Sequence, residues 1–544
     1  MTAATLVRTS APADGGGWTG TGTLLRVALR RDRLRLAVWA VALGGLVTYF
    51  VAALPAVYPD AASRQARAAI MREPSGALMS GPGFGLDDYT VGVMVANELL
   101  GMLAVAAALM SSFLVVRHTR AEEEAGRLDL VLAGAVGRRA PLTAALLTAL
   151  VANAVVAAAL LAALLPAGLA VPDSVAVAGG VAAVGLVLAG VAAVAAQLTT
   201  TARGANGLAG AVVGLAFVLR GVGDARQRGG SALSWASPIG WAQQSRAFVE
   251  LRWWPLLLCL ALAAALVVLA SALARRRDVG AGLLPERRGR ATAGPLLRSP
   301  LALVVRLERT AVVAWAAGLA VMAALTGSLV EGVVDSFADD PELAAAFGAT
   351  GADVVLGMLS AFVGFFAMAV TVFAVATVLR MGREEARGRT ATVLAAPVGR
   401  PAWMGAHLAV ALAGSAGLLA VGGAALGAGA QTVTGDRGLV GDLGLAALGH
   451  LPVVAAFAAV AALVHALRAP AWAVWVPLAA SIVVGLYGGL LDLPRAVLDA
   501  VPFAILPALP ADAFAAAPVA AVTGAALAIG AAAVALYRRR DLVA

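Results

Sequence analysis

Long apolar runs separated by short polar segments dominate the chain. Each run holds about 20 apolar residues, the length that a bilayer-spanning helix needs, and the sequence lacks the short alternating segments of a membrane β-barrel. The pattern predicts an all-α polytopic membrane protein with twelve transmembrane helices. They are expected at about 36–54, 91–116, 141–165, 175–198, 204–222, 253–274, 311–331, 353–379, 403–430, 443–467, 469–491 and 513–537.

A charged segment occurs twice, after the second apolar run of each half. Residues 122–138 read EEEAGRLDLVLAGAVGR and residues 384–400 read EEARGRTATVLAAPVGR, and 10 of 17 aligned positions are identical. We call them the first and second repeat segments. The chain therefore consists of two copies of one membrane module. The identical pairs are Glu122/Glu384, Glu123/Glu385, Gly126/Gly388, Arg127/Arg389, Val131/Val393, Leu132/Leu394, Ala133/Ala395, Val136/Val398, Gly137/Gly399 and Arg138/Arg400.

Other positions support the same division. Arg30 and Trp39 match Arg306 and Trp315, and each half ends in an arginine stop, ARRRD at 274–278 and YRRRD at 537–541. Six runs in each half make the repeats parallel rather than inverted. The predicted organisation is a cytosolic N-terminus with an interfacial elbow helix at 1–35, a six-span module at 36–274, a cytosolic linker at 275–310, a second six-span module at 311–537 and a cytosolic C-terminus at 538–544.

Two segments outside the spans have an amphipathic pattern. Residues 22–36 alternate apolar and basic side chains, which favours a helix that lies in the interface and attracts anionic lipid; an ordinary basic flank is the alternative. Residues 231–255 hold four tryptophans and are too polar to span, so we expect a short re-entrant or interfacial helix on the outer side. Residues 492–512 are its expected counterpart in the second half.

Charge sets the orientation and limits the chemistry. With the N-terminus inside, 30 of the 40 basic residues fall on the cytosolic side, as the positive-inside rule requires. All 40 are arginine, so the chain cannot contain the P-loop lysine that binds nucleotide phosphates. An ATP-driven protein of this sequence would need a partner subunit that binds ATP and Mg²⁺. The one cysteine, Cys259, lies in an apolar run and is expected to be a buried thiol.

The repeat segments are the main candidate functional site. Their acids are expected at a helix start, where they favour the helix dipole; the glycines permit a turn; the arginines can bind a partner's carboxylates. A passive cytosolic loop that survived gene duplication is the alternative. The candidate coupling residues are Glu122, Glu123, Glu124, Gly126, Arg127, Glu384, Glu385, Gly388 and Arg389.

Polar residues within or beside the spans are candidates for a substrate pathway, because a charge at the bilayer centre costs about 2.5–3.5 kcal/mol on insertion scales. The candidates are Asn97, Glu98, Gln197 and Asn206, and hydration near the interface is the alternative for Glu98 and for Glu331. The four histidines lack metal-site spacing. The pairs Asp87/Asp88 and Asp339/Asp340 are read as solvated acidic faces, so no metal or catalytic site is predicted.

The pattern E-E-x-x-G-R-x-x-x-V-L-A-x-x-V-G-R between second and third spans resembles the coupling-helix region of ABC-2 type exporter permeases. SPIGWAQQSRAF at 237–248, followed by RWWP, is similar to the actinobacterial polyketide-antibiotic exporters of the tetronasin-resistance type. The second half departs from this pattern, with PFAILPALPADAF at 502–514. The resemblance covers nearly the whole chain.

That resemblance implies a type V exporter fold, an outer re-entrant helix between the fifth and sixth spans, and two copies of a cytosolic ABC ATPase subunit that dock on the repeat segments. The expected cargo is a hydrophobic or amphipathic compound such as an antibiotic, exported across the plasma membrane. Membrane lipids are the other expected partners, and no nucleic acid is expected. The alternatives are an ion-coupled twelve-span drug transporter and a membrane scaffold without transport.

The orientation can be tested by labelling. In a Cys259→Ser background, single cysteines at the equivalent positions Ala133 and Ala395 should react with a membrane-impermeant maleimide only after the cytosolic face is opened. Labelling of either cysteine in intact cells would contradict the predicted topology.

Overall fold

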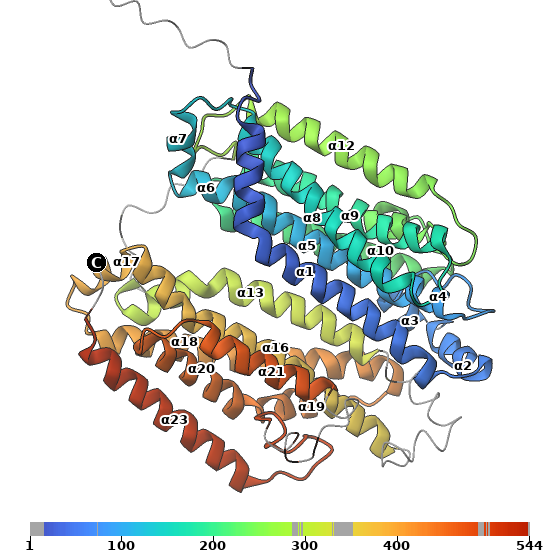
Figure 1. The fold of residues 1–544 in the computed structure, drawn as a ribbon. Coiled ribbons are helices and arrows are strands. Elements are labelled where there is room, and N and C mark those ends of the chain that lie inside the picture. The colour runs from blue at the N-terminus through green and yellow to red at the C-terminus, as the bar shows by residue number, and fades with distance from the viewer. Residues whose placement is uncertain are drawn as a thin grey trace, which may run out of the picture. The chain divides into compact units, whose positions relative to one another are not determined.

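The computed structural model describes residues 16–72, 74–284, 297–328, 352–487 and 501–541, with residues 292, 294, 330, 494, 496 and 498. The chain divides into two compact units, unit 1 at Met1–Arg288 and unit 2 at Gly289–Ala544. The division falls inside the segment expected as a linker. Every regular element in the described ranges is helical, and Figure 1 shows the helices of each unit.

Unit 1 holds six of the helices that are long and apolar enough to cross a membrane. The second of them runs through α4, a π-helical turn (η1), α5 and α6, with a break in the helical conformation at Thr119 between α5 and α6. The elements are α1 (Thr21–Val57), α2 (Ala61–Arg72), α3 (Pro74–Met79), α4 (Val91–Met94), η1 (Val95–Leu99), α5 (Leu100–His118), α6 (Arg120–Glu124), α7 (Arg127–Leu132), α8 (Ala140–Leu164), α9 (Val171–Leu198), α10 (Ala202–Arg226), η2 (Ser234–Ala236), α11 (Pro238–Gln243) and α12 (Trp254–Ala274).

Unit 2 holds five such helices in its described residues, which brings the total there to eleven rather than twelve. The span expected at 469–491 coincides with α21, which is 16 residues long, and residues 488–493 lie outside the described part. The elements are α13 (Pro300–Gly327), α16 (Ala352–Ala386), α17 (Arg389–Leu394), α18 (Arg400–Thr434), α19 (Leu439–Leu448), α20 (Leu451–Ala466), α21 (Trp472–Tyr487) and α23 (Ala516–Arg539). Glu331, Asp339 and Asp340 also lie outside the described residues.

The short elements differ from two expectations. Residues 22–36 form the first turns of α1 and continue into the span without a break, so they are not a separate helix. After Gly22 in the first turn of α1, this stretch contains no glycine or proline, and an uninterrupted helix keeps its backbone hydrogen bonds inside the segment. A short helix is present within 231–255 as α11, whereas the described residues 501–512 of its expected counterpart, 492–512, form turns and bends.

The same spans are central in both units. The second and fourth spans are the most buried, at 72% each in unit 1, whereas the last spans of the two units, α12 and α23, are 22% and 11% buried. Small residues allow this close packing. A Cβ added to Gly185 of α9 would lie 1.9 Å from Asn153 Oδ1, and one added to Gly190 would lie 2.7 Å from Leu266 Cβ. The central helices thus depend on glycines that face their neighbours.

Close packing of α13 against α18 gives a testable consequence. A Cβ at Gly429 would lie 2.0 Å from the Ala324 carbonyl oxygen, whereas a Cβ at Gly417 on the same helix meets nothing within 4 Å. Gly429→Ala should therefore destabilise the purified protein by about 1–3 kcal/mol through overpacking. Gly417→Ala should cause no loss. Unfolding in detergent measures both, and equal stability of the two variants would contradict this packing.

Candidate functional site

Each repeat segment folds as a turn followed by a short helix. In unit 1 the turn separates α6 from α7, and in unit 2 it separates α16 from α17. Gly126 and Gly388 precede the short helices with φ angles of 68° and 71°, in the left-handed region that glycine adopts without a steric cost. The matched glycines therefore set the same change of direction twice.

The acids of the two segments lie in different helical positions. Glu122 and Glu123 lie in the first turn of α6, because Thr119 adopts a non-helical conformation that separates α5 from α6. Glu384 and Glu385 instead lie in the last turn of α16, which runs unbroken to Ala386. The expectation of a helix start is therefore wrong for unit 2. At a helix C-terminus the dipole disfavours a carboxylate, so these two acids need cationic neighbours.

The arginine of each segment binds the segment's own first glutamate. Arg127 Nε lies 2.6 Å from Glu122 Oε2, and its Nη2 lies 3.0 Å from Oε1. Arg389 Nε lies 2.8 Å from Glu384 Oε2, and its Nη2 lies 3.2 Å from Oε1. Both pairs are bidentate, the strong geometry for guanidinium and carboxylate. The Glu122 carboxylate raises the pKa of Arg127.

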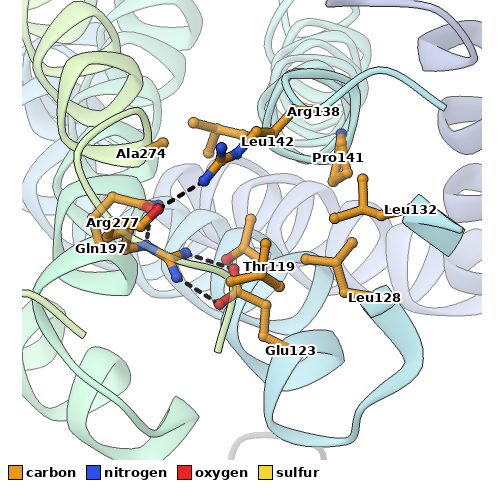
Figure 2. Close-up of a pocket in the computed structure, with 11 residues that line it drawn as sticks. Thr119, Glu123, Leu128, Leu132, Arg138, Pro141, Leu142, Gln197, Ala274 and Arg277 are labelled. Atoms are coloured by element: carbon orange, nitrogen blue, oxygen red, sulfur yellow. Dashed lines mark hydrogen bonds and ion pairs between the residues drawn. The ribbon is translucent and has the colours of Figure 1, made fainter. Parts of the chain in front are cut away.

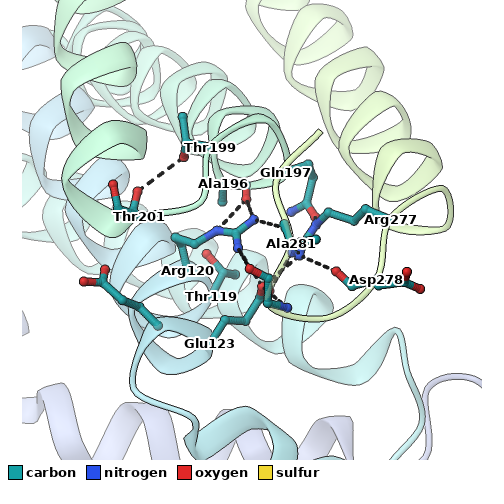
Figure 3. A network of polar contacts seen from close by, with 12 residues as sticks. Thr119, Arg120, Glu123, Ala196, Gln197, Thr199, Thr201, Arg277, Asp278 and Ala281 are labelled. Atoms are coloured by element: carbon teal, nitrogen blue, oxygen red, sulfur yellow. Dashed lines mark hydrogen bonds and ion pairs between the residues drawn. The ribbon is translucent and has the colours of Figure 1, made fainter. Parts of the chain in front are cut away.

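The second glutamate of the first segment is buried in a polar network. Arg277 binds it with Nη2–Oε1 and Nη1–Oε2 distances of 2.6 and 2.8 Å, and Arg120 Nη1 lies 3.0 Å from Oε2 of Glu123. Figure 2 shows Glu123, Gln197 and Arg277 converging on a cavity of about 50 Å³, large enough for a few water molecules. Figure 3 shows Arg120 donating to the Ala196 carbonyl beside this network.

The second glutamate of the second segment has equivalent surroundings. Arg540 Nη2 lies 2.5 Å from Glu385 Oε1, and His465 Nε2 lies 3.4 Å from Oε2. The side chains of Glu123 and Glu385 are only 6% and 9% exposed. The acidic pairs of the repeat segments therefore face the interior of their units rather than a partner.

The solvent-exposed face of each segment is formed by other residues. Leu130 at the centre of α7 is 77% exposed, and its equivalent on α17, Thr392, is also exposed. Arg127 and Arg389 are about half exposed. Glu124 lies beside this face, where it accepts a hydrogen bond from the Ala202 backbone amide at the start of α10. This is the face of each segment that is left exposed to solvent.

A second pair of buried contacts joins the first span to the second in each unit. Asp32 of α1 lies 2.5 Å from His118 Nε2 in unit 1, and Glu308 of α13 lies 2.8 Å from Arg380 Nη1 in unit 2. The match of Arg30 with Arg306 aligns Asp32 with Glu308, and the repeat segments align His118 with Arg380. The alignment of the two halves was therefore sufficient to predict that these equivalent positions form a contact, but the sequence analysis did not identify them.

Asn97 and Glu98 lie together at the end of the second span that is opposite the repeat segment, the end expected to face outward. Glu98 is in the π-helical turn η1, where Arg67 binds it with distances of 3.3 Å from Nε to Oε1 and 2.9 Å from Nη2 to Oε2. The Tyr89 hydroxyl donates to Oε1 at 2.9 Å. Asn97 donates to the Phe84 carbonyl. Both side chains thus fasten the outer segment 61–90 to the span.

Gln197, near the end of α9, and Asn206, near the start of α10, lie at the span ends that are opposite to those of Asn97 and Glu98. Gln197 accepts a hydrogen bond from Arg277 Nε at 2.6 Å, and Asn206 lies in the second turn of α10 with a buried Oδ1 that has no hydrogen-bond partner. The four pathway candidates therefore do not form one site. Sequence reasoning missed the polar contact inside the bundle, where Asn153 Nδ2 donates to Ser111 Oγ at 2.8 Å.

In the described part of the chain, no three His, Cys, Asp or Glu side chains are placed to hold a metal ion. Asp87 is paired with Arg72 at 2.8 Å. Cys259 is buried, as expected for a structural thiol.

Known proteins resemble the chain over nearly its full length. Residues 22–275 and 297–538 match the family described as multidrug efflux system permease Rv1217c, C-terminal domain. The chain is also 40% identical over 504 residues to the multidrug efflux system permease protein Rv1217c of Mycobacterium tuberculosis (strain ATCC 25618 / H37Rv), which covers 91% of this chain and 90% of that protein.

The left-handed glycines allow a test of the segment geometry. Gly388 has open space around its Cβ position, so Gly388→Ala should destabilise the turn by about 1 kcal/mol through backbone strain alone. Amide hydrogen exchange in α17 should become about five times faster, and Gly388→Asn should cost less because asparagine tolerates this conformation. Gly134→Ala, at a glycine with negative φ, is the control; an equal effect there would contradict the assignment.

Proposed function

The chain belongs to the family of the multidrug efflux system permease Rv1217c, and from that membership we propose that it is the membrane subunit of an ATP-driven exporter. A separate ABC ATPase supplies the energy. Two copies of that ATPase dock on the cytosolic side, one on each repeat segment, and bind the ATP and Mg²⁺. The chain itself carries no ATPase site, because it has no lysine for a P-loop.

The observation that carries this proposal is the duplicated geometry of the repeat segments. Each has a left-handed glycine, a bidentate arginine–glutamate pair and an exposed short helix at the end of the second span. A passive loop needs none of these features in two copies. A rigid, exposed helix that is fastened to the spans is what a soluble motor needs to transmit a movement.

The mechanism follows from the covalent order of the elements. Each short helix lies between the central second span and the third span, so displacement of α7 or α17 moves two helices of its unit at once. ATP-driven closure of the docked subunits pushes both short helices, tilts the two units and opens the pathway outward. We propose twelve spans in two parallel sets of six, with both termini in the cytoplasm.

The proposed cargo is a hydrophobic or amphipathic compound, because the spans consist largely of Ala, Val, Leu and Gly. The relative's name, which refers to multidrug efflux, supports a drug or antibiotic. The resemblance of residues 237–248 to tetronasin-resistance permeases makes polyketide antibiotics the first class to test. Asn97 and Glu98 are proposed to act at the outer exit through their contacts with the outer segment.

The rival functions make different demands. An ion-coupled transporter needs titratable acids deep in several spans, but Glu98 is at an outer end and paired with Arg67. A non-transporting scaffold needs no motor. Efflux that continues without ATP but stops when the proton gradient is collapsed would favour the ion-coupled transporter, and an ATPase that binds without any efflux would favour the scaffold.

Docking can be tested on the exposed face. Leu130→Asp combined with Thr392→Asp should reduce co-purification of a co-expressed partner ABC ATPase at least tenfold, because a desolvated carboxylate is placed in each contact. The matched control is Leu284→Asp, an exposed leucine outside the repeat segments. ATP hydrolysis by the purified complex should fall with binding. Unchanged association of the double variant would contradict docking at these helices.

A further inference from the structure

We propose that Glu123–Arg277 and Glu385–Arg540 are two equivalent mechanical links, each of which joins a repeat segment to the cytosolic end of the sixth span of its own unit. We call them the sixth-span links. The inference rests on the proposed function, because it assigns a role in transmitting the movement that the docked ATPase starts. It concerns residues that are buried and therefore separate from the docking face.

The first step is that the residues of the two links occupy equivalent positions in the two halves of the chain. Glu123 and Glu385 are equivalent positions of the repeat segments, 262 residues apart. Arg277 and Arg540 are both the third arginine of an arginine stop, in ARRRD and YRRRD. Both partners of the contact therefore occupy matched positions in the two halves, and both halves form it.

The second step is the geometry. Arg277 binds Glu123 through two bonds of 2.6 and 2.8 Å, and Arg540 binds Glu385 at 2.5 Å. All four side chains are at most 12% exposed. Removing one member of a buried pair leaves an uncompensated charge, which is strongly destabilising. Contacts of this kind hold their two elements in one arrangement, unlike exposed ion pairs, which contribute little.

The third step is that the sixth span needs a contact that connects it to the repeat segment. The sixth spans are the least buried of the spans in unit 1 and unit 2, jointly with α1 in unit 1. They lie far from the repeat segments along the chain. In unit 1, α12 packs against α9 and against the outer helix α11. A helix of 21 residues is about 32 Å long, so a link at its cytosolic end connects the first repeat segment with the outer side.

The outer end of this path is also tied down. Gln243 at the end of α11 donates to the Ser80 carbonyl of the outer segment at 2.8 Å, and its amide nitrogen would lie 2.5 Å from a Cβ at Gly81. The outer segment in turn holds Glu98 through Arg67. A movement of the first repeat segment thus has a continuous set of packed contacts through α12 to the outer end of the second span.

The two links differ in one respect that makes an experiment possible. In unit 1 a second cation, Arg120, also contacts Glu123. The equivalent position in unit 2 is Gly382, and His465 occupies the neighbouring space, 3.6 Å from a Cβ built there. Unit 2 therefore has one arginine on its link, so charges can be exchanged there without placing two arginines together.

The test is a charge exchange in the complete complex, with the efflux of ethidium from cells as the transport readout. Glu385→Arg alone and Arg540→Glu alone should each lower ATP-dependent efflux at least tenfold while ATPase binding stays within twofold. The double variant Glu385→Arg with Arg540→Glu should restore efflux to within threefold of the unaltered chain. Arg252→Glu, which breaks an exposed ion pair with Glu250, should leave efflux unchanged.

Several outcomes would overturn the proposal. A double variant that accumulates and binds the ATPase but does not transport contradicts the link, as does a single variant whose binding falls as far as its efflux. Where Arg540→Glu fails to accumulate, Arg540→Gln keeps the side-chain volume and must still separate efflux from binding. Failure of the unaltered chain to bind any ATPase would instead contradict the proposed function itself.

Discussion

Buried carboxylate–guanidinium contacts beside the repeat segments are the interaction on which the rest of this structure depends. A carboxylate that is removed from water is costly unless a cation and hydrogen bonds compensate it. Glu123 and Glu385 receive that compensation from Arg277 and Arg540. Each contact joins elements that are distant in sequence, and each holds the exposed short helix of its unit in a defined position. The apolar spans alone provide no such directional contact, because lipid is as apolar as their side chains.

The two units form the contact between their first and second spans with different residues. Unit 1 pairs Asp32 with His118, whereas unit 2 pairs Glu308 with Arg380 at the equivalent positions. Arginine keeps its charge, whereas histidine is charged only when it is protonated, so the two pairs differ in chemistry. Unit 1 also has the helix α11 between α10 and α12, whereas the described residues 501–512 of unit 2 form turns and bends. The halves are thus related by duplication but differ in these contacts.

The sequence was a good guide to the helices and a partial guide to the site. Apolar runs of sufficient length predicted each of the eleven long helices, and the tryptophan-rich stretch predicted α11. The same reasoning was wrong about the acids of the second segment, because nothing in RMGREEA stops α16, whereas the backbone of Thr119 interrupts the helix in unit 1. It also read Arg127 and Arg389 as ligands for a partner, although each binds a glutamate five residues earlier in its own segment.

Sequence alone determined that the chain is a helical membrane protein, that its halves repeat, and that the segments after the second spans are its distinctive charged feature. These properties depend on local composition and on comparison of the chain with itself, which need no coordinates. The tertiary structure decided which charges meet. Arg277 lies 154 residues from Glu123, and Arg540 lies 155 residues from Glu385, so only the folding of the sixth span against its unit brings them together. Burial and ion pairing depend on that approach, and the structure distinguished the exposed faces of the short helices from the buried charges beside them.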